Sequence, residues 1–68
     1  MKNAAIKLGE NLKRIRMSKG ISQGDIARAL DVDKAFISNI ENGKANPTLA
    51  TITKLAGAIS VPSRKLLS

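Results

Sequence analysis

The chain has 68 residues, with 12 Lys and Arg against 5 Asp and Glu, which gives a formal net charge of +7 and an isoelectric point of about 10.4. A chain this short hides only about 60% of its unfolded surface, which predicts one compact domain over residues 1–68 and excludes a large enclosed active site. It contains no Cys and no His, so disulfides, thiolate metal sites and the commonest general base are excluded, and we expect no metal or other cofactor.

The first predicted helix begins near the N-terminus and carries an apolar stripe opposite a basic face. The stripe repeats at three- and four-residue steps, the period of an α-helix, in Ala5, Leu8, Leu12 and Ile15. The basic residues off this stripe are Lys7, Lys13, Arg14 and Lys19. Gly9 lies inside the segment and costs about 1 kcal/mol relative to Ala, so we expect the first turn to fray or the helix to start later.

The same N-terminal segment argues against export or membrane insertion. Its longest apolar run is Ala4–Ile6, closed by Lys7, which is far shorter than a signal-peptide core or a membrane span. We therefore expect a soluble cytoplasmic protein without a membrane partner. The positive charge instead predicts a polyanionic partner, for which nucleic acid is the first candidate.

The stretch from Gly20 to Pro47 predicts two short capped helices joined by a tight turn. Ser22 and Asp25 have the spacing of a capping box, so the first of these helices starts at Ser22. Its apolar face is formed by Ile26, Ala27 and Leu30, and it ends near Leu30. Two helices joined by so few residues must cross steeply, which predicts a DNA-binding helix-turn-helix over residues 22–42.

The second helix of this motif follows a corner at residues 31–32. Asp33 is expected to cap it. Ile37 and Ile40 fall on its inward face and are expected to be core residues. Gly43 supplies the left-handed backbone that ends the helix.

Two more helices are predicted after Asn46-Pro47, which breaks the chain. Thr48 caps the fourth helix, whose apolar stripe consists of Ile52, Leu55, Ala56 and Ile59. Val61-Pro62 opens a last short helix, because Pro is tolerated in a first helical turn. This helix runs through Leu66 and Leu67.

Taken together, these segments predict an all-α fold, a compact bundle of five helices. No segment shows the alternation of β-branched and aromatic residues that is typical of a strand. Phe36 is the only aromatic residue, so the core is expected to be aliphatic.

Several short sequence features follow one another along this chain. They are Arg16 in the first helix, Ser22-Gln23, Ile26-Ala27, Ile37-Ser38 followed by Glu41-x-Gly43, Pro47, and the segment from Ala56 to Val61. With these features the chain resembles the phage repressor and Cro-type helix-turn-helix family, also called the XRE family, from about Leu8 to Leu67. The resemblance implies a lambda repressor-like DNA-binding domain and a sequence-specific transcriptional regulator.

The narrower resemblance is to small single-domain regulators, including controller proteins of restriction-modification systems, which share a run similar to residues 33–38. Two positions depart from the family pattern. Relatives often carry Gly at the corner and at the end of the fourth helix, where this chain has Asp31 and Ser60. Both residues can still turn the chain, with some strain if the backbone is left-handed.

In this family the third helix, residues 33–42 here, lies in the major groove with its N-terminal residues at the base edges. The resemblance implies base contacts from Lys34, Ala35, Phe36, Ser38 and Asn39. Lys34 can donate to guanine, Asn39 can pair with adenine and Ala35 can touch a thymine methyl group. The alternatives are a solvated or phosphate-facing Lys34 and a half-buried packing role for Phe36, whereas Asp33 is expected only to cap the helix.

The resemblance also implies phosphate contacts on both sides of the groove. These are expected from Ser22, Gln23, Asn42 and Lys44, which would position the protein without specifying sequence. The alternatives are an exposed helix residue for Gln23 and a solvated surface charge for Lys44. Arg16 and Glu41 are expected to form a partly buried ion pair that joins the first helix to the third, so both are interpreted as structural.

A single recognition helix contacts too few base pairs for useful specificity. We therefore expect a two-fold homodimer on a palindromic operator in double-stranded DNA, with the two third helices about 34 Å apart. The expected interface is apolar surface of the C-terminal helices, from Val61, Leu66, Leu67 and parts of residues 48–59. At least one of Leu66 and Leu67 is expected to close the monomer core, and no small-molecule substrate is expected.

An antitoxin-like or other protein-binding regulator with the same fold is the main alternative function, and a long apolar patch left after self-association would favour it. A cationic membrane-surface helix conflicts with five separately capped segments. An enzyme would need an acid, base or nucleophile that no His, Cys or carboxylate pair supplies here. Single-stranded RNA binding would need aromatic residues for stacking, and Phe36 stands alone.

Overall fold

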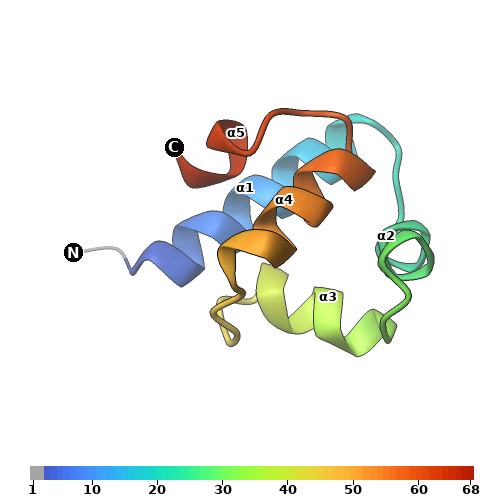
Figure 1. Cartoon of the computed structure of the whole chain (residues 1–68), viewed down its shortest axis with the longest axis horizontal. Helices are drawn as coiled ribbons and strands as arrows, with labels where there is room; N and C mark the ends of the chain where they lie inside the picture. The colour runs from blue at the N-terminus through green and yellow to red at the C-terminus, as the bar shows by residue number, and fades with distance from the viewer. Residues whose placement is uncertain (1–2) are drawn as a thin grey trace.

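The computed structural model describes residues 3–68, and within this range the chain forms five α-helices and no strand (Figure 1). The helices are α1 (Ala4–Ser18), α2 (Gln23–Leu30), α3 (Lys34–Glu41), α4 (Leu49–Ala58) and α5 (Arg64–Leu67). Helix α1 packs against α3 and α5, while α2 packs against α3 and α4. Helices α3 and α5 lie on opposite sides of the molecule (Figure 1). The presence of helices alone among the described residues confirms the predicted all-α fold.

Helix α1 starts after Asn3, whose side chain accepts a hydrogen bond of 2.7 Å from the backbone N–H of Ala5. The predicted apolar stripe of α1 is buried in full. The later start expected because of Gly9 is wrong, since α1 begins at Ala4 and Gly9 is helical and buried. A Cβ atom at this position would lie only 2.3 Å from the carbonyl oxygen of Ile40 and 2.7 Å from that of Glu41. Glycine at residue 9 therefore lets α1 and the end of α3 approach closely.

The start of α2 has the predicted capping box. The hydroxyl of Ser22 accepts a 2.9 Å hydrogen bond from the N–H of Asp25, and the Asp25 carboxylate accepts one of 2.9 Å from the N–H of Ser22. Asp31 ends α2 in the left-handed region, with φ of 59°, so it takes the conformation for which relatives often use glycine.

Helix α3 begins after Asp33, but the predicted side-chain cap is absent. Asp33 occupies the N-cap position with extended backbone, and its carboxylate makes no capping hydrogen bond. The residue type suits the position, but the N–H of Phe36 donates instead to the backbone carbonyl of Asp33, at 3.0 Å. The other end agrees with the prediction, because Gly43 is left-handed, with φ of 73°.

Helix α4 is capped by Thr48, whose hydroxyl accepts a 3.2 Å hydrogen bond from the N–H of Thr51. Ser60 follows α4 in the left-handed region, with φ of 58°. Helix α5 starts later than predicted: Ser63 holds the N-cap position and the first helical residue is Arg64. Pro62 therefore precedes the helix, and its carbonyl accepts a hydrogen bond from the N–H of Lys65.

The core is aliphatic and draws on all five helices. The side chains with almost no exposure include Leu12, Ile26, Ile37, Ile40, Leu55, Ile59 and Leu66. Leu66 closes the core, whereas Leu67 is 53% exposed, so the prediction that at least one of the two is a core residue is confirmed. Asn11 is a buried polar residue that the sequence analysis did not single out. Its amide donates two hydrogen bonds of 2.9 Å, to the carbonyls of Leu66 and Ser68, which fastens α5 to α1.

Candidate nucleic-acid interface

Helix α3 has two distinct faces. Its inward face consists of Ile37, Ile40 and Glu41, which are all buried. Its outward face, a term used here for four of the predicted base-contact residues, consists of Lys34, Ala35, Ser38 and Asn39; Ser38 is partly exposed and the other three are exposed. The eight-residue helix thus holds four side chains of the predicted site on one rigid surface.

Phe36 differs from the other predicted base-contact residues. It is half-buried and packs against the hydrophobic core. This placement matches the packing role that the sequence left open, in which the ring braces the start of α3. Phe36 directly follows Ala35 in the chain and is partly exposed.

The far end of α3 is anchored by the predicted ion pair between Arg16 and Glu41. Arg16 Nε lies 2.6 Å from Glu41 Oε2, and Arg16 Nη2 lies 3.0 Å from Oε1. Arg16 Nη1 also donates to the carbonyl of Ile21 at 3.0 Å. The hydrogen bond to Glu41 raises the pKa of Arg16, helped by the charge of the carboxylate and opposed by burial of the guanidinium. The pair is bidentate and joins α1 to α3, as predicted.

Gln23 also binds this ion pair, which sequence reasoning did not anticipate. Its Nε2 donates a 2.9 Å hydrogen bond to Glu41 Oε1, and the residue is half-buried at the first position of α2. Glu41 thus accepts hydrogen bonds from both α1 and α2. Its two partners lie 25 and 18 residues away in the chain, so no local pattern in the sequence signals the contact.

A hollow of about 530 Å³ opens between the start of α2 and the start of α3. Its lining, which we call the basic hollow, consists of Arg16, Ser22, Gln23, Gly24, Arg28 and Lys34. The first amides of a helix have no intrahelical acceptor and carry partial positive charge, so the start of α2 adds donors to this basic surface. The structure thus brings Ser22 and Gln23 together with Lys34, whereas Asn42 and Lys44 are exposed beyond the other end of α3.

Arg28 belongs to the basic hollow but was not among the predicted site residues. It forms an exposed ion pair with Asp25, three residues earlier on α2. Hydrogen bonds from the backbone N–H and the hydroxyl of Ser22, together with Arg28, lower the pKa of Asp25. Helical spacing between an acidic and a basic residue signals such a pair, but only the fold places Arg28 beside Lys34.

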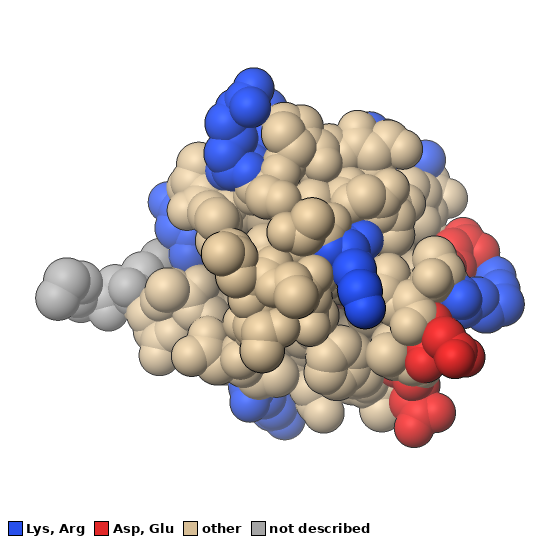
Figure 2. Space-filling model, viewed as in Figure 1, with Lys and Arg blue, Asp and Glu red and all other residues tan. Residues whose placement is uncertain are grey.

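Charge is unevenly spread over the surface. Figure 2 shows basic side chains at separate places on one face, and acidic side chains gathered at one edge, where α2 meets α3 in Figure 1. Asp25, Asp31 and Asp33 belong to this part of the chain. The outward face of α3 is therefore bordered by carboxylates at its start, and its positive charge comes from Lys34 and from the basic hollow.

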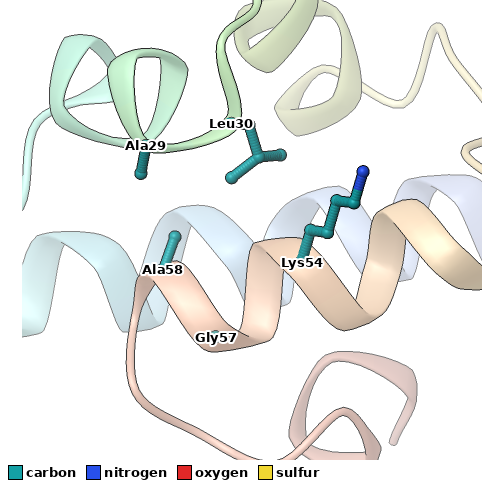
Figure 3. A pocket seen from close by; sticks show the side chains of 5 residues that line it. All are labelled: Ala29, Leu30, Lys54, Gly57 and Ala58. Atoms are coloured by element: carbon teal, nitrogen blue, oxygen red, sulfur yellow. The ribbon is translucent and has the colours of Figure 1, made fainter.

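A second hollow, the α2–α4 groove, has a volume of about 460 Å³ and is lined by Ala29, Leu30, Lys54, Gly57 and Ala58. In Figure 3 the small side chains of α2 and α4 face one another across it, and the Lys54 amine lies at one end. No residue of this groove belongs to the predicted site. Within residues 3–68, no cluster of three or more acidic, Cys or His side chains is suited to hold a metal ion. No described helix is both long and apolar enough to cross a membrane.

Comparison with known families assigns this arrangement. Residues 12–66 match the family described as Helix-turn-helix (HTH_3). The chain belongs to this family. The predicted resemblance to XRE-type regulators is thereby confirmed, and the match includes the ion pair, the basic hollow and the outward face of α3.

Individual relatives of the helix-turn-helix family support the assignment. The transcriptional regulator SutR of Escherichia coli K12 is 37% identical over 68 residues, which is all of this chain but 38% of SutR. The control protein C.MunI of a Mycoplasma species is 33% identical over 69 residues and 93% of its length is covered. The crystal structure of the restriction-modification controller C.AhdI from Aeromonas hydrophila superimposes with a TM-score of 0.86 at 34% identity, covering 91% of this chain and 94% of C.AhdI. These relatives are transcriptional regulators and controller proteins, as expected.

Proposed function

We propose that this helix-turn-helix protein is a cytoplasmic transcriptional regulator that binds a palindromic DNA operator as a homodimer, with α3 in the major groove. The observation that carries the proposal is the division of α3 into a buried inward face and an exposed outward face. A major groove about 12 Å wide admits one α-helix. The exposed outward face suits this contact, because the buried inward face holds the helix in place.

The outward face would contact the bases. Lys34 can donate to guanine O6 and N7, and Asn39 can form two hydrogen bonds with adenine. Ala35 suits contact with a thymine methyl group, and Ser38 can pair with several bases. Phe36 would touch the DNA only with its exposed edge, while its packing against the core keeps the start of α3 in place.

Phosphate contacts would hold the protein on either side of the groove. Ser22 and Gln23, in the basic hollow, would contact one strand at the start of α2. Asn42 and Lys44, which follow α3, would contact the other strand. Such contacts fix orientation and add affinity that falls with salt, but they carry no sequence information.

Dimerisation would use the C-terminal helices. Leu49 on α4 is 69% exposed and Leu67 on α5 is 53% exposed, and α4 packs against α5. Large apolar side chains exposed at this level favour association in water. A two-fold dimer through this surface would present two copies of α3 to half-sites about 34 Å apart. Occupancy of the operator would then depend on the concentration of the protein, because two chains must associate to form the dimer.

The test is selection of binding sites from a random pool of duplex DNA, followed by affinity measurements on the selected and a scrambled duplex over a salt series. We expect a palindromic motif bound at least about a thousandfold more tightly than the scrambled duplex. Lys34→Ala should lose discrimination at one position in each half-site. The control is Lys13→Ala, which removes the same charge from an exposed position on α1, outside the outward face of α3 and the proposed dimer surface.

Equal binding of both duplexes at every salt concentration would contradict the proposal. The positive charge would then act without sequence specificity, and the exposed apolar residues of α4 and α5 would be the surface for a protein partner. Sedimentation of the protein, alone and with the selected operator, tests the dimer. The proposed dimer must form either in solution or on the operator.

A further inference from the structure

Glu41 is the point where three helices of this protein meet. It is the last residue of α3, its side chain is only 2% exposed, and its carboxylate accepts hydrogen bonds from Arg16 on α1 and Gln23 on α2. We propose that Glu41 is a positioning residue for DNA binding: it holds the Gln23 amide so that the second Nε2 hydrogen is directed to a backbone phosphate. This inference rests on the proposed function.

The hydrogen-bond inventory of Gln23 supports the assignment. A glutamine amide nitrogen carries two donors in one plane, and one of them is used at 2.9 Å on Glu41 Oε1. That bond fixes which end of the amide is nitrogen and restricts its rotation. The second donor remains, and Gln23 lines the basic hollow together with Lys34 and Ser22. The side chain is therefore ordered before DNA arrives, which lowers the entropy cost of the phosphate contact.

The charge balance explains why a carboxylate can take this role close to DNA. A free carboxylate would repel the phosphate backbone. Here both oxygens of Glu41 accept from Arg16, at 2.6 Å and 3.0 Å, so the guanidinium compensates the negative charge. Arg16 itself lines the basic hollow. The ion pair thus joins α1 to α3 and also orients a neutral donor in a surface whose net charge stays positive.

A purely structural role of Glu41 and a positioning role predict different contacts with single phosphates. If Glu41 only stabilises the fold, a folded variant at residue 41 still contacts the same phosphates as the natural protein. If Glu41 positions Gln23, the variant loses one particular phosphate contact although residue 41 does not touch DNA. Duplexes in which one phosphate at a time is replaced by an uncharged methylphosphonate measure this directly.

In this scan on the selected operator, we expect one phosphate per half-site at which the replacement weakens binding of the natural protein about tenfold. Gln23→Ala should be insensitive at that position. Glu41→Met, which keeps a side chain of similar length but removes both acceptor oxygens, should lose most of the same sensitivity because Gln23 Nε2 loses its partner. Lys44→Ala, which removes a predicted phosphate contact beyond the other end of α3, should keep it, and its own lost position should be a different one.

Full sensitivity of Glu41→Met at the phosphate that Gln23→Ala no longer senses would overturn the inference, as would the absence of any such phosphate. Both results leave the proposed function intact if the natural protein prefers its operator. If the natural protein binds the scrambled duplex equally well, the proposed function itself fails.

A second measurement covers the case in which Glu41→Met does not fold. Gln23 is the only glutamine in the chain, so labelling glutamine side-chain amides with ¹⁵N gives a single NH₂ pair in the NMR spectrum of the natural protein. We expect one of the two protons to be displaced from its position in a solvated glutamine and to exchange slowly with water, because it is bonded to Glu41. Operator DNA should shift the other proton. No shift of either proton at saturating operator would overturn the inference.

Discussion

The two helices of the helix-turn-helix have the same length but are held in different ways. Helices α2 and α3 both have eight residues and both follow a polar N-cap residue. The start of α2 is sealed by a complete capping box, whereas Asp33 leaves the start of α3 without a side-chain cap. At the other end, α3 is fixed by the bonds of Glu41 to Arg16 and Gln23.

This difference teaches where the rigidity of the proposed interface comes from. Helix α2 is stabilised locally, by groups within its own first turn. Helix α3 is stabilised by its buried inward face, through Ile37 and Ile40, and by the hydrogen bonds of its last residue, Glu41. Its first turn carries exposed side chains at Lys34 and Ala35 and has no side-chain cap, and this is the end that the proposed function places against DNA.

The largest expected effect comes from breaking the anchored end of α3. Glu41→Ala leaves Arg16 without its carboxylate and Gln23 without its acceptor. Removing one partner of a buried ion pair costs about 3 kcal/mol or more, which for a domain of this size lowers the melting temperature by more than about 10 °C. Thermal unfolding followed by circular dichroism measures the shift.

Asn42→Ala is the matched control, because Asn42 follows Glu41 directly and is exposed. It should change the free energy of unfolding by less than about 0.5 kcal/mol. An unchanged melting temperature in Glu41→Ala would show that the ion pair does not anchor α3.

Changes on the outward face of α3 should weaken operator binding without lowering stability. Asn39→Ala is expected to weaken operator binding by about 1–3 kcal/mol, the range for one bidentate base contact, while the melting temperature stays within about 2 °C because Asn39 is exposed. Asn46→Ala provides the comparison, since it removes an exposed amide outside the helices. Equal binding by the Asn39 and Asn46 variants would remove Asn39 from the base contacts.

The caps of the two helices offer a smaller contrast. Ser22→Ala breaks the capping box and should lower the free energy of unfolding by about 1 kcal/mol. Asp33→Ala should change it by less than about 0.5 kcal/mol, because no side-chain cap is lost. Chemical denaturation distinguishes the two values. Operator affinity should rise in Asp33→Ala, since a carboxylate at the start of α3 repels DNA phosphates; a fall would mean that Asp33 contacts a base.

The smallest expected effect is a dependence on pH. Ser22 and Arg28 lower the pKa of Asp25 in the folded protein from its ordinary value of 3.8. The stabilisation is therefore fully present above the unfolded pKa and is lost as the pH falls through the lower, folded pKa. Unfolding measured between pH 5 and about pH 2 should show a shallower loss of stability in Asp25→Asn than in the natural protein. Parallel curves would exclude Asp25 as a source of the acid sensitivity.

Features that depend on neighbouring residues along the chain were predictable from the sequence. The apolar stripes of α1 and α4, the capping box at Ser22 and the end of α3 at Gly43 follow from helical period and cap chemistry. The left-handed conformations of Asp31 and Ser60 match the positions where the family often uses glycine. The ion pair between Arg16 and Glu41 was implied by the resemblance and is present in the structure.

Features that depend on packing between distant segments were not predictable. Gly9 was interpreted as a weak point of α1, because helix propensity does not register the backbone of α3 behind it. The bonds of Asn11 to α5 and of Gln23 to Glu41 join residues far apart in the chain. The predicted side-chain cap of Asp33 is absent, although the residue type suits the position. The roles of the base and phosphate contacts stay predictions, which the experiments above address.

The close approach at Gly9 also has a genetic consequence. Every missense change in the codon for residue 9 introduces a Cβ atom, which would lie 2.3 Å from a backbone oxygen that cannot rotate away. The smallest replacement, alanine, must therefore push the end of α3 outward or bend α1. Loss-of-function alleles that map to this codon would be changes in the pose of the recognition helix, although the altered residue lies on the opposite side of that helix from DNA in the proposed complex.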